Sequence, residues 1–555
     1  MQKTVLIIFF VIWYSTSIGQ KQICVDGSFT GNPENGSPSN PYRTIQAAIN
    51  EALSGDTIKV AKGMYSAQAL QIVEKKVHLL GGYAGSGDFN HANPLANETL
   101  IEGTEEAPCI FIDIQGASIA GSMTISGFTI RNGQRGIELS GGWSGFLDNI
   151  AIENNIIENN GTTGTSQRGG GIGLDGKNVI IRKNVIRNNR SDRGAAIGGT
   201  SSHIENFLVA DNIIDSNKGY GDHGGGMIIS GTGTITRNIF DSNVTAMADP
   251  SYGWGGAICV VNEDTLKLIT LSHNIYRNNY APDRGGAVFV DEAAKVLMEH
   301  ELFYDNRTKK SGSAIYVDEH WDHTPSVLYM NNCTVWGNST DEPDGAALFV
   351  QSSSAHIQNC IFWNNGSDFD SVAEGHLSVE YTLTQKGFAG SGNISSDPLF
   401  ADAPNGDFHL KSTNGRFNPI TEEWENDEVN SPAIDAGNPS SDYSNEIEPN
   451  GGRVNLGCYG NTPEASKSKA NAVVNETALI SWTIFPNPAK GNITIAPLQS
   501  GSNVIITNIA GRKVFNAVIK SERININTAA FDNGVYIIQV VNNGAVEAKK
   551  FIVRK

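Results

Sequence analysis

Short runs of β-branched and aliphatic residues, each broken by Asn, Gly or Asp, fill the middle of the chain. Runs of this kind between turn-forming residues predict strands joined by turns. No apolar periodicity typical of a helix separates them. One phrase, Asn-aliphatic-aliphatic-x-Asn-Asn, recurs through this region. It stands in full or degenerate form at 155–160, 184–189, 212–217, 238–243, 274–279, 304–306, 336–338 and 363–365.

A second phrase, a strand that opens on small residues, alternates with the first. Its copies begin at Gly169, Gly194, Gly224, Gly255, Gly285 and Gly312, so that the pair of phrases repeats about every 25 to 33 residues. A unit this short cannot bury a core alone, so successive units must stack. We expect the aligned Asn side chains to form hydrogen bonds along the stack. The repeat strongly resembles that of right-handed parallel β-helices, which implies an all-β solenoid over residues 20–396.

Residues 41–65 precede the repeats and have a different pattern. Ile45, Ala48, Ile49 and Ala52 fall on one face of a helix, and a turn, a strand and a further turn follow at 55–65. A helix here would cover the open end of the solenoid, as the ends of stacks require. The segment resembles the opening of many β-helix polysaccharide lyases and glycosidases. That resemblance is specific to the fold and not to one activity.

The repeats fade after about residue 366. Phrases at 397–400, 405–410, 431–437 and 451–460 resemble the closing region of bacterial β-helix proteins, so residues 397–462 are interpreted as a structural closing region. The segment that follows is small and polar. It predicts a linker over residues 463–480.

Residues 481–555 change character again. About seven short alternating strands follow the Phe485-Pro486-Asn487-Pro488 opening, which predicts a small C-terminal β-sandwich. The order of its motifs closely resembles the C-terminal sorting domain of type IX secretion. That resemblance implies an encounter with the secretion machinery, passage across the outer membrane, and release or attachment at the cell surface. An ordinary carbohydrate-binding sandwich is the alternative.

The first residues also predict an exported protein. Lys3, an apolar run from Val5 to Tyr14, and small residues at Ser17 and Gly19 indicate a signal peptide over residues 1–19. The net charge of -18 makes nucleic acid a poor partner, because phosphate binding needs a basic surface. The six cysteines are too sparse for a disulfide scaffold. Cys333 and Cys360 stand in matching contexts, as stacked core thiols or as a disulfide.

Aligning the repeats on the first Gly as position zero turns the sequence into columns. Positions three and five are aliphatic and are expected to face the core. Since side chains alternate along a strand, positions two, four and six are expected to face solvent. Position two is always small. Position four becomes aromatic at Phe289, Tyr316 and Phe349, and position six carries Asp175, Asp291, Asp318 and Gln351. These columns predict a groove in which Phe289 and Phe349 bind sugar rings, or else rings buried under a loop.

A basic column precedes the Gly. It reads Arg168, Arg193, His223, Trp254, Arg284, Ser311 and Asp344, and Asp192, Asp222 and Asp283 come just before three of these. Stacked cations repel unless anions answer them. Either the neighbouring Asp residues form surface ion pairs, or the cations meet the carboxylates of a uronic-acid polymer. In the second case Arg168 and Trp254 are candidate substrate-binding residues.

A lyase of acidic glycans needs a cation to neutralise the uronate carboxylate, a base to take the C5 proton, and an acid to protonate the leaving oxygen. Arg193 and Arg284 are the candidate cations, His223 the base and Tyr316 the acid. Asp291, Glu292, Asp318 and Glu319 are oxygen-rich enough to predict a calcium site. The spacing of Asp291 and Asp318 equally suits a retaining glycosidase.

Three functional hypotheses stay open from the sequence. The leading one is a secreted, monomeric enzyme acting on an anionic extracellular polysaccharide, most simply a lyase. The second is a glycoside hydrolase that uses the Asp291 and Asp318 region. The third is a non-catalytic surface adhesin or glycan-binding solenoid, since Gly-Gly-Ala-Ile repeats also occur in surface proteins.

Overall fold

The computed structural model describes residues 20–66, 69–114, 119–141, 147–164, 167–246, 252–262, 264–343, 345–469, 482–509, 511–542 and 545–555. Its contacts divide the chain into two units, Met1–Ala470 and Asn471–Lys555, and each is described here by itself. The predicted signal peptide and Asp344 lie outside the described residues.

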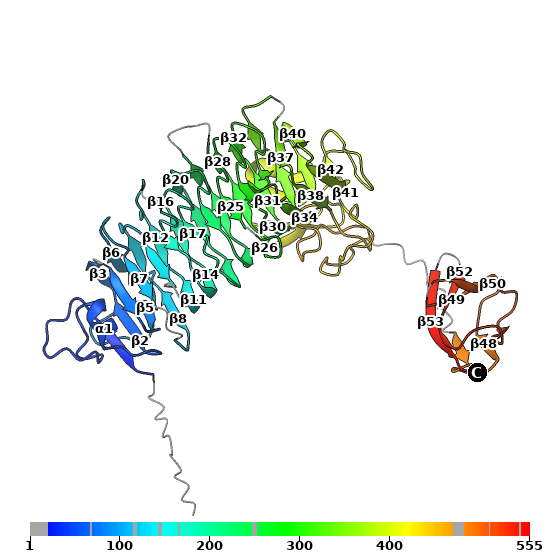
Figure 1. The fold of residues 1–555 in the computed structure, drawn as a ribbon, viewed down its shortest axis with the longest axis horizontal. Coiled ribbons are helices and arrows are strands. Elements are labelled where there is room, and N and C mark those ends of the chain that lie inside the picture. The colour runs from blue at the N-terminus through cyan, green and yellow to red at the C-terminus, as the bar shows by residue number, and fades with distance from the viewer. Residues whose placement is uncertain are drawn as a thin grey trace, which may run out of the picture. The chain divides into compact units, whose positions relative to one another are not determined.

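The first unit is a stack of coils whose strands pair in parallel with those of the next coil (Figure 1). Counting described residues, the first sheet has 13 strands: β1 (Gln22–Val25), β2 (Thr57–Ala61), β5 (His78–Tyr83), β8 (Met123–Ser126), β11 (Asp148–Glu153), β14 (Lys177–Arg182), β18 (Phe207–Ala210), β22 (Gly233–Thr236), β26 (Leu268–Ser272), β30 (Lys295–Glu299), β34 (Val327–Asn331), β38 (Ser354–Gln358) and β41 (His376–Glu380). The second sheet, in the same described ranges, has 11: β4 (Leu70–Val73), β7 (Ile110–Asp113), β10 (Ile137–Ser140), β13 (Ile172–Gly173), β17 (Ile197–Gly199), β21 (Met227–Ile229), β25 (Ile258–Val261), β29 (Val288–Asp291), β33 (Ile315–Val317), β37 (Ala346–Gln351) and β40 (Ser367–Val372).

Two further parallel sheets complete the coils. Within the part of the chain that the structure describes, the third sheet has 12 strands: β3 (Gly63–Ser66), β6 (Thr99–Glu102), β9 (Thr129–Arg131), β12 (Ile156–Glu158), β15 (Val185–Arg187), β19 (Ile213–Asp215), β23 (Ile239–Asp241), β27 (Ile275–Arg277), β31 (Leu302–Tyr304), β35 (Thr334–Trp336), β39 (Ile361–Trp363) and β42 (Leu383–Thr384). The described fourth sheet has six: β16 (Arg190–Ser191), β20 (Lys218–Gly219), β24 (Val244–Thr245), β28 (Tyr280–Ala281), β32 (Arg307–Thr308) and β36 (Ser339–Thr340). The predicted parallel β-helix is confirmed.

The two corners at the ends of the third sheet are built from one left-handed residue followed by a buried residue, which is Asn in most coils. At the corner between the first and third sheets, Lys183 has φ 55° and Asn184 is 1% exposed. The backbone N–H of Asn155 donates to Asn184 Oδ1 (3.0 Å), and Asn184 Nδ2 donates to Ile152 O (2.8 Å). The same contacts recur on neighbouring coils and form the first Asn ladder, which comprises Asn155, Asn184, Asn212, Asn238 and Asn274.

A second Asn ladder lies at the other end of the third sheet. Its members are Asn160, Asn189, Asn217, Asn243, Asn279, Asn306, Asn338 and Asn365. Because a buried backbone N–H without a partner is costly, the ladders satisfy donors that strand pairing leaves over at each corner. The predicted hydrogen bonding of aligned Asn residues along the stack is confirmed.

The core is one continuous column of mainly aliphatic side chains, and its composition corrects one prediction. Positions three and five face inward as expected, for example Ile258 and Val260. The small residues of position two, however, belong to the same core, as Ala196, Ala257, Ala287, Ala314 and Ala347 do. In the copies that open at Gly169 to Gly312 the strands of the second sheet begin at position three, so position two lies in the corner before the strand, where alternation does not hold. In β37, which begins at Ala346, position two lies within the strand and is buried as well. The prediction that it floors a groove was therefore wrong.

The predicted capping helix is α1 (Ile45–Glu51). Thr44 caps its N-terminus, since the Thr44 hydroxyl accepts from Ala47 N–H at 3.3 Å. Ile45, Ala48 and Ile49 are buried in the solenoid core. The helix contacts β1, β2 and β4, and so covers the core at the first coils.

The closing region packs on the outer face of the third sheet. It contains two hairpins, β43 (Phe400–Asp402) with β44 (Asp407–Leu410), and β45 (Arg416–Asn418) with β46 (Glu423–Glu425), and a short 3-10 helix, η1 (Ala403–Asn405). Phe408 and Leu456 pack with Leu302 and Ile361 of β31 and β39. The expected linker begins later than residue 463, because the Ser466 hydroxyl donates to Leu410 O at 2.5 Å and Ala465 is buried.

The first Asn ladder changes residue type at its C-terminal end. Strand register places Glu301, Cys333 and Cys360 where Asn would follow Asn274. Glu301 is fully buried, and its carboxyl oxygen accepts from Asn274 N–H (3.0 Å). Burial raises the pKa of Glu301 to about 8. Cys333 N–H donates to Cys360 Sγ (3.3 Å), and all six cysteines are free and buried, which agrees with stacked core thiols.

The second unit is the predicted small β-sandwich. In its described residues β47 (Thr483–Phe485), β48 (Asn492–Ala496) and β51 (Ile524–Asn527) form one antiparallel sheet, and β49 (Asn503–Asn508), β50 (Lys513–Val518), β52 (Gly534–Asn542) and β53 (Ala545–Val553) form the other. A core that includes Trp482, Ile506 and Phe551 lies between them.

Removing one rung of the second Asn ladder should destabilise the first unit. Asn189 Nδ2 donates to Ile157 O (2.9 Å) and Asn217 Oδ1 (3.0 Å), and Asn189 Oδ1 accepts from Asn160 N–H (3.0 Å). Asn189→Ala leaves these buried groups unpaired at about 1–3 kcal/mol each, so we expect a clear fall in the urea midpoint. Arg187→Ala is the control. Arg187 is on the same coil and forms an exposed ion pair with Glu158, which contributes at most about 1 kcal/mol to stability. Equal midpoints for the two variants would contradict the role of the ladder.

Glu301 should make stability fall with rising pH. Between the ordinary Glu value and about 8 the unfolded chain releases a proton that the folded chain retains, so stability drops by about 1.4 kcal/mol per pH unit. Glu301→Gln has no ionisable group here and should therefore lose less stability than the wild type between about pH 5 and pH 8. Urea midpoints measured across this range test this, and parallel profiles for the two proteins would refute it.

Candidate functional site

The outward face of the second sheet carries a cluster of rings that is covered and not open. Phe289 is 1% exposed, Tyr316 4% and Phe349 9%, and the three pack with Ile228 and Cys259. The ring centroids lie 5.7 Å apart for Phe289 and Tyr316, and 4.8 Å for Tyr316 and Phe349. The alternative of buried packing is therefore correct for most of this column, and Phe289 cannot be a platform for a sugar.

The residues of the basic column lie side by side on successive coils, as the repeats predict, and several of its cationic side chains form ion pairs with carboxylates. Bridges pair Arg168 with Arg193, and His223 with Trp254. Arg193 donates to both oxygens of Asp222, from Nε at 2.6 Å and from Nη2 at 2.9 Å. The bidentate geometry makes this a strong pair. Arg193 thus follows the ion-pair alternative, with the acid of the next coil.

A basic pocket of about 350 Å³ opens beside this column. Four of its lining residues are basic, Arg168, Arg193, His223 and Lys267, and one is acidic, Glu292. The remaining lining residues are Thr200, Ser202, Ile228, Ser230, Val261 and Asn262. Arg168 is exposed, and no described acid forms an ion pair with Arg168 or Lys267. The pocket therefore presents free positive charge to a ligand.

His223 lies between two carboxylates at the wall of the basic pocket. Its Nδ1 is 2.8 Å from Asp222 Oδ1 and its Nε2 is 3.8 Å from Asp291 Oδ2. Burial lowers the pKa of His223, but the nearby carboxylates of Asp222 and Asp291 outweigh this effect, so that the pKa is raised. The protonated form is favoured and cannot accept a proton. This geometry speaks against His223 as the base and suits it to donate a proton.

Arg284, Tyr316 and Phe349 belong to a separate second pocket of about 510 Å³. The other residues that line it are Lys310, Ser311, Glu342, Pro343, Gly345 and Asp370. Arg284 Nη1 lies 2.5 Å from Asp318 Oδ2, and its guanidinium stacks 5.0 Å from the Tyr316 ring. The Tyr316 hydroxyl donates to Gln351 (2.8 Å), and burial raises its pKa. Arg284 and Tyr316 therefore line a different pocket from His223.

The four acids predicted to bind calcium face different partners. Asp318 pairs with Arg284, Asp291 faces His223, Glu292 lies 3.8 Å from His320 Nε2, and Glu319 lies 3.2 Å from His323 Nδ1. Among the described residues, no group of three or more His, Cys, Asp or Glu side chains is arranged to hold a metal ion. The geometry gives no support to the calcium site.

Trp254 was predicted to bind substrate, whereas Lys267, which lines the basic pocket, was not among the predicted residues. Trp254 is half-buried, with its ring 4.6 Å from His223 and 5.6 Å from Phe289, and its Nε1 donates to Asp283 (2.7 Å). Lys267 was not predicted. It lies in the turn between β25 and β26, where the repeats do not align, so no column contains it. The turns between the second and first sheets differ in length from coil to coil, so the repeat offered no signal for Lys267.

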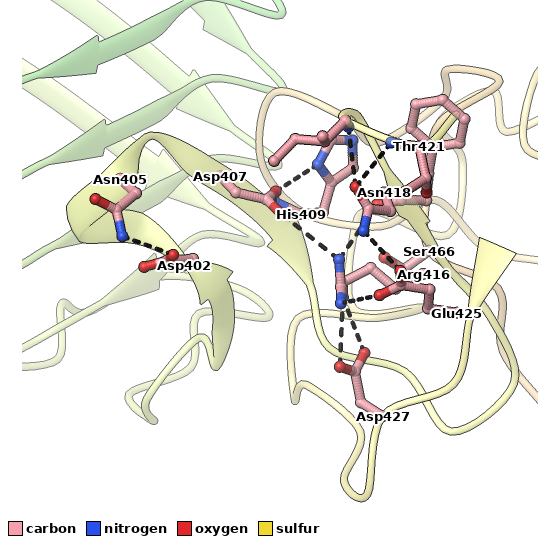
Figure 2. Close-up of polar contacts among 12 residues, drawn as sticks. Asp402, Asn405, Asp407, His409, Arg416, Asn418, Thr421, Glu425, Asp427 and Ser466 are labelled. Carbon is pink, nitrogen blue, oxygen red and sulfur yellow. Dashed lines mark hydrogen bonds and ion pairs between the residues drawn. The ribbon is translucent and has the colours of Figure 1, made fainter. Parts of the chain in front are cut away.

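A second group of titratable side chains lies in the closing region (Figure 2). His409 Nδ1 is 2.7 Å from Asp407 Oδ1, and Arg416 pairs with Glu425 and Asp427, each at 3.1 Å. His409 is fully buried, and the ring of Tyr459 stacks on it at 3.7 Å. Because no substrate can reach this imidazole, the network serves to hold the closing region together.

Comparison with known families identifies both units. A family described as secretion system C-terminal sorting domain matches residues 483–554, and one described as right handed beta helix region matches 254–383. The chain is a right-handed parallel β-helix protein with a type IX secretion sorting domain. The sorting domain directs the β-helix protein to the cell surface or the extracellular space, as predicted. None of its described helices is long and apolar enough to cross a membrane.

Other similarities of the β-helix protein do not assign an activity. Residues 29–247 match a protein family of unknown function (DUF1565), and 334–437 a family described as disaggregatase related. No curated protein matches the chain.

Solved structures are similar only at low identity. PorZ, a surface component of the type IX secretion system of Porphyromonas gingivalis, is 22% identical over 17% of this chain and 15% of its own, with a TM-score of 0.14. The pectate lyase Pel9A is 12% identical over 80% and 97%, with a TM-score of 0.37. XylC, solved with xylose, is 11% identical over 91% and 100%, with a TM-score of 0.41.

Replacing Asp222 should lower the pKa of His223. Asp222→Asn removes a negative charge 2.8 Å from Nδ1, so burial then weighs more heavily against the imidazolium. Titration of labelled histidine by NMR measures the shift. Asp215→Asn, which removes a carboxylate from the third sheet, is the control and should leave His223 unchanged. An unaltered His223 titration in Asp222→Asn would show that this carboxylate does not hold the proton.

Proposed function

We propose that the β-helix protein is a secreted lyase that binds an acidic extracellular polysaccharide in the basic pocket and cleaves it by β-elimination. The observation that carries the proposal is the pair of cations, Arg168 and Lys267, that line this pocket without an ion pair among the described residues. A uronate carboxylate supplies the missing negative charge. Charge-assisted hydrogen bonds of this kind are stronger than neutral ones.

The pocket holds candidates for each part of the elimination. Arg168 and Lys267 neutralise the uronate carboxylate, which stabilises the charge that develops when C5 loses its proton. Glu292 is the acid among the lining residues and accepts that proton as a carboxylate. The electron pair forms the C4–C5 double bond, and the C4–O glycosidic bond breaks. His223, held protonated by Asp222 and Asp291, donates a proton to the leaving oxygen.

A glycoside hydrolase is the second candidate, because Asp291 and Asp318 lie in register on adjacent coils. Burial raises the pKa of Asp318 to about 6 against the opposing effect of Arg284, which suits a general acid next to a second carboxylate. Two observations weigh against it. Asp318 is committed to Arg284, and neither carboxylate lines the basic pocket or the second pocket.

The purified protein should release an unsaturated uronate from at least one acidic glycan. Alginate, pectate, chondroitin and a set of neutral glycans are incubated with it, and the ultraviolet absorbance of the new double bond is followed. Glu292→Gln should lower turnover by about 10²–10⁴-fold, the usual contribution of an acid–base group, while binding is kept. The double variant Arg168→Ala, Lys267→Ala should weaken binding of the acidic glycan.

Arg237→Ala is the matched control, since this Arg lies outside the pocket in a surface ion pair with Asp211. It should leave binding and turnover unchanged. New reducing ends without the unsaturated product would favour the hydrolase. Binding without any cleavage would leave a non-catalytic glycan-binding solenoid, and absence of both would remove all three functions.

A further inference from the structure

The second pocket lies on the same face of the second sheet as the basic pocket. The basic pocket is lined by Ile228 of β21 and by His223 in the corner before that strand. The second pocket is lined by Tyr316 of β33 and by Ser311 in the corner before it. Only β25 and β29 lie between these strands. Three inter-strand steps of about 4.8 Å separate the two pockets by about 14 Å along the solenoid, so one extended glycan chain can reach both.

The two pockets differ in charge. The second pocket is lined by two basic residues, Arg284 and Lys310, and two acidic ones, Glu342 and Asp370. Both cations already form ion pairs: Arg284 Nη1 lies 2.5 Å from Asp318 Oδ2, and Lys310 Nζ lies 2.5 Å from Asp283 Oδ1. Glu342 and Asp370 are exposed at its rim. A uronate carboxylate placed there meets like charge and no free cation, and is repelled.

What remains in the second pocket suits an uncharged sugar. The small exposed parts of Tyr316 and Phe349 supply limited apolar contact. The Ser311 hydroxyl can donate or accept a hydrogen bond, and the two rim carboxylates can accept hydrogen bonds from sugar hydroxyls. Between the pockets, the half-buried ring of Trp254 continues the row of rings that runs from His223 to Phe349. Most of this row is buried, with Phe289 only 1% exposed, so the half-buried Trp254 is the ring that a glycan chain passing between the pockets can contact.

We infer that the second pocket is a binding subsite for an uncharged sugar unit, and that the substrate is a heteropolysaccharide in which a uronate is followed by uncharged sugars. The inference rests on the proposed function of the basic pocket. It makes the solenoid axis the direction of the bound chain, with the acidic unit near β21 and the uncharged unit near β33.

Binding of oligosaccharides of increasing length tests the subsite. The probes are glucuronate-bearing xylo-oligosaccharides, which carry one acid, and oligogalacturonides, which carry one on every unit, both measured by calorimetry. With the single-acid probe we expect affinity to rise at least tenfold once the chain spans both pockets. Asp370→Trp, which fills the second pocket from an exposed position, should abolish this gain and leave binding of the short probes unchanged.

Val372→Trp is the matched control, because Val372 is exposed on the same strand and does not line the pocket. It should keep the gain with length. The double variant Glu342→Gln, Asp370→Asn should bind long oligogalacturonides more tightly than the wild type and the single-acid probe equally well.

The outcomes separate the inference from the function on which it rests. If short acidic probes bind but affinity does not rise with length, or Asp370→Trp behaves as the wild type, the second subsite is refuted. If the double variant gains nothing for oligogalacturonides, the argument from charge is refuted. If neither probe binds at any length, the proposed function fails and the subsite falls with it.

Discussion

The buried Asn side chain at the ends of the third sheet is the interaction on which the rest of the structure depends. A coil must turn sharply while its backbone N–H groups stay inside, and water cannot reach them. Asn solves both problems, because its amide accepts from one coil and donates to another. The left-handed residue before it sets the turn. The ladders therefore fix the register of the coils between Asn155 and Asn365, and the columns on the outer face of these coils align because of that register.

The fold could be predicted from the sequence because the repeated Asn and Gly residues mark the corners and the aliphatic runs between them mark the strands. The outer surface was less readable. Alternation predicted the side of Ile258 and Val260 correctly but failed for Ala257, since that residue precedes the strand. It also placed Phe289 on the outer face without revealing that neighbouring side chains cover it. Lys267 was not predicted as a pocket residue, because an alignment of the repeats does not compare residues in turns of unequal length.

The arginines of the basic column form their closest ion pairs with carboxylates of neighbouring coils. Asp192 precedes Arg193 in sequence, yet its carboxylate accepts from Gly164 N–H and Gln167 N–H, and Arg193 turns to Asp222 on the next coil. Likewise Arg284 is matched by Asp318, which lies 34 residues further on. Which cationic side chain has no ion pair, and hence where an anionic ligand is attracted, depends on the carboxylates that neighbouring coils supply. Candidate residue types could be named from the sequence, but their grouping into two pockets could not.

The first Asn ladder also bears on how such a protein changes length during evolution. Between Asn155 and Asn274 every rung offers the same donor and the same acceptor, so a duplicated coil finds matching partners on both sides. From Glu301 onwards the rungs are Glu, Cys and Cys, each matched only to its present neighbour. Gain or loss of coils is therefore easier in the N-terminal stretch, which holds most of the basic pocket, than in the stretch that carries the closing region.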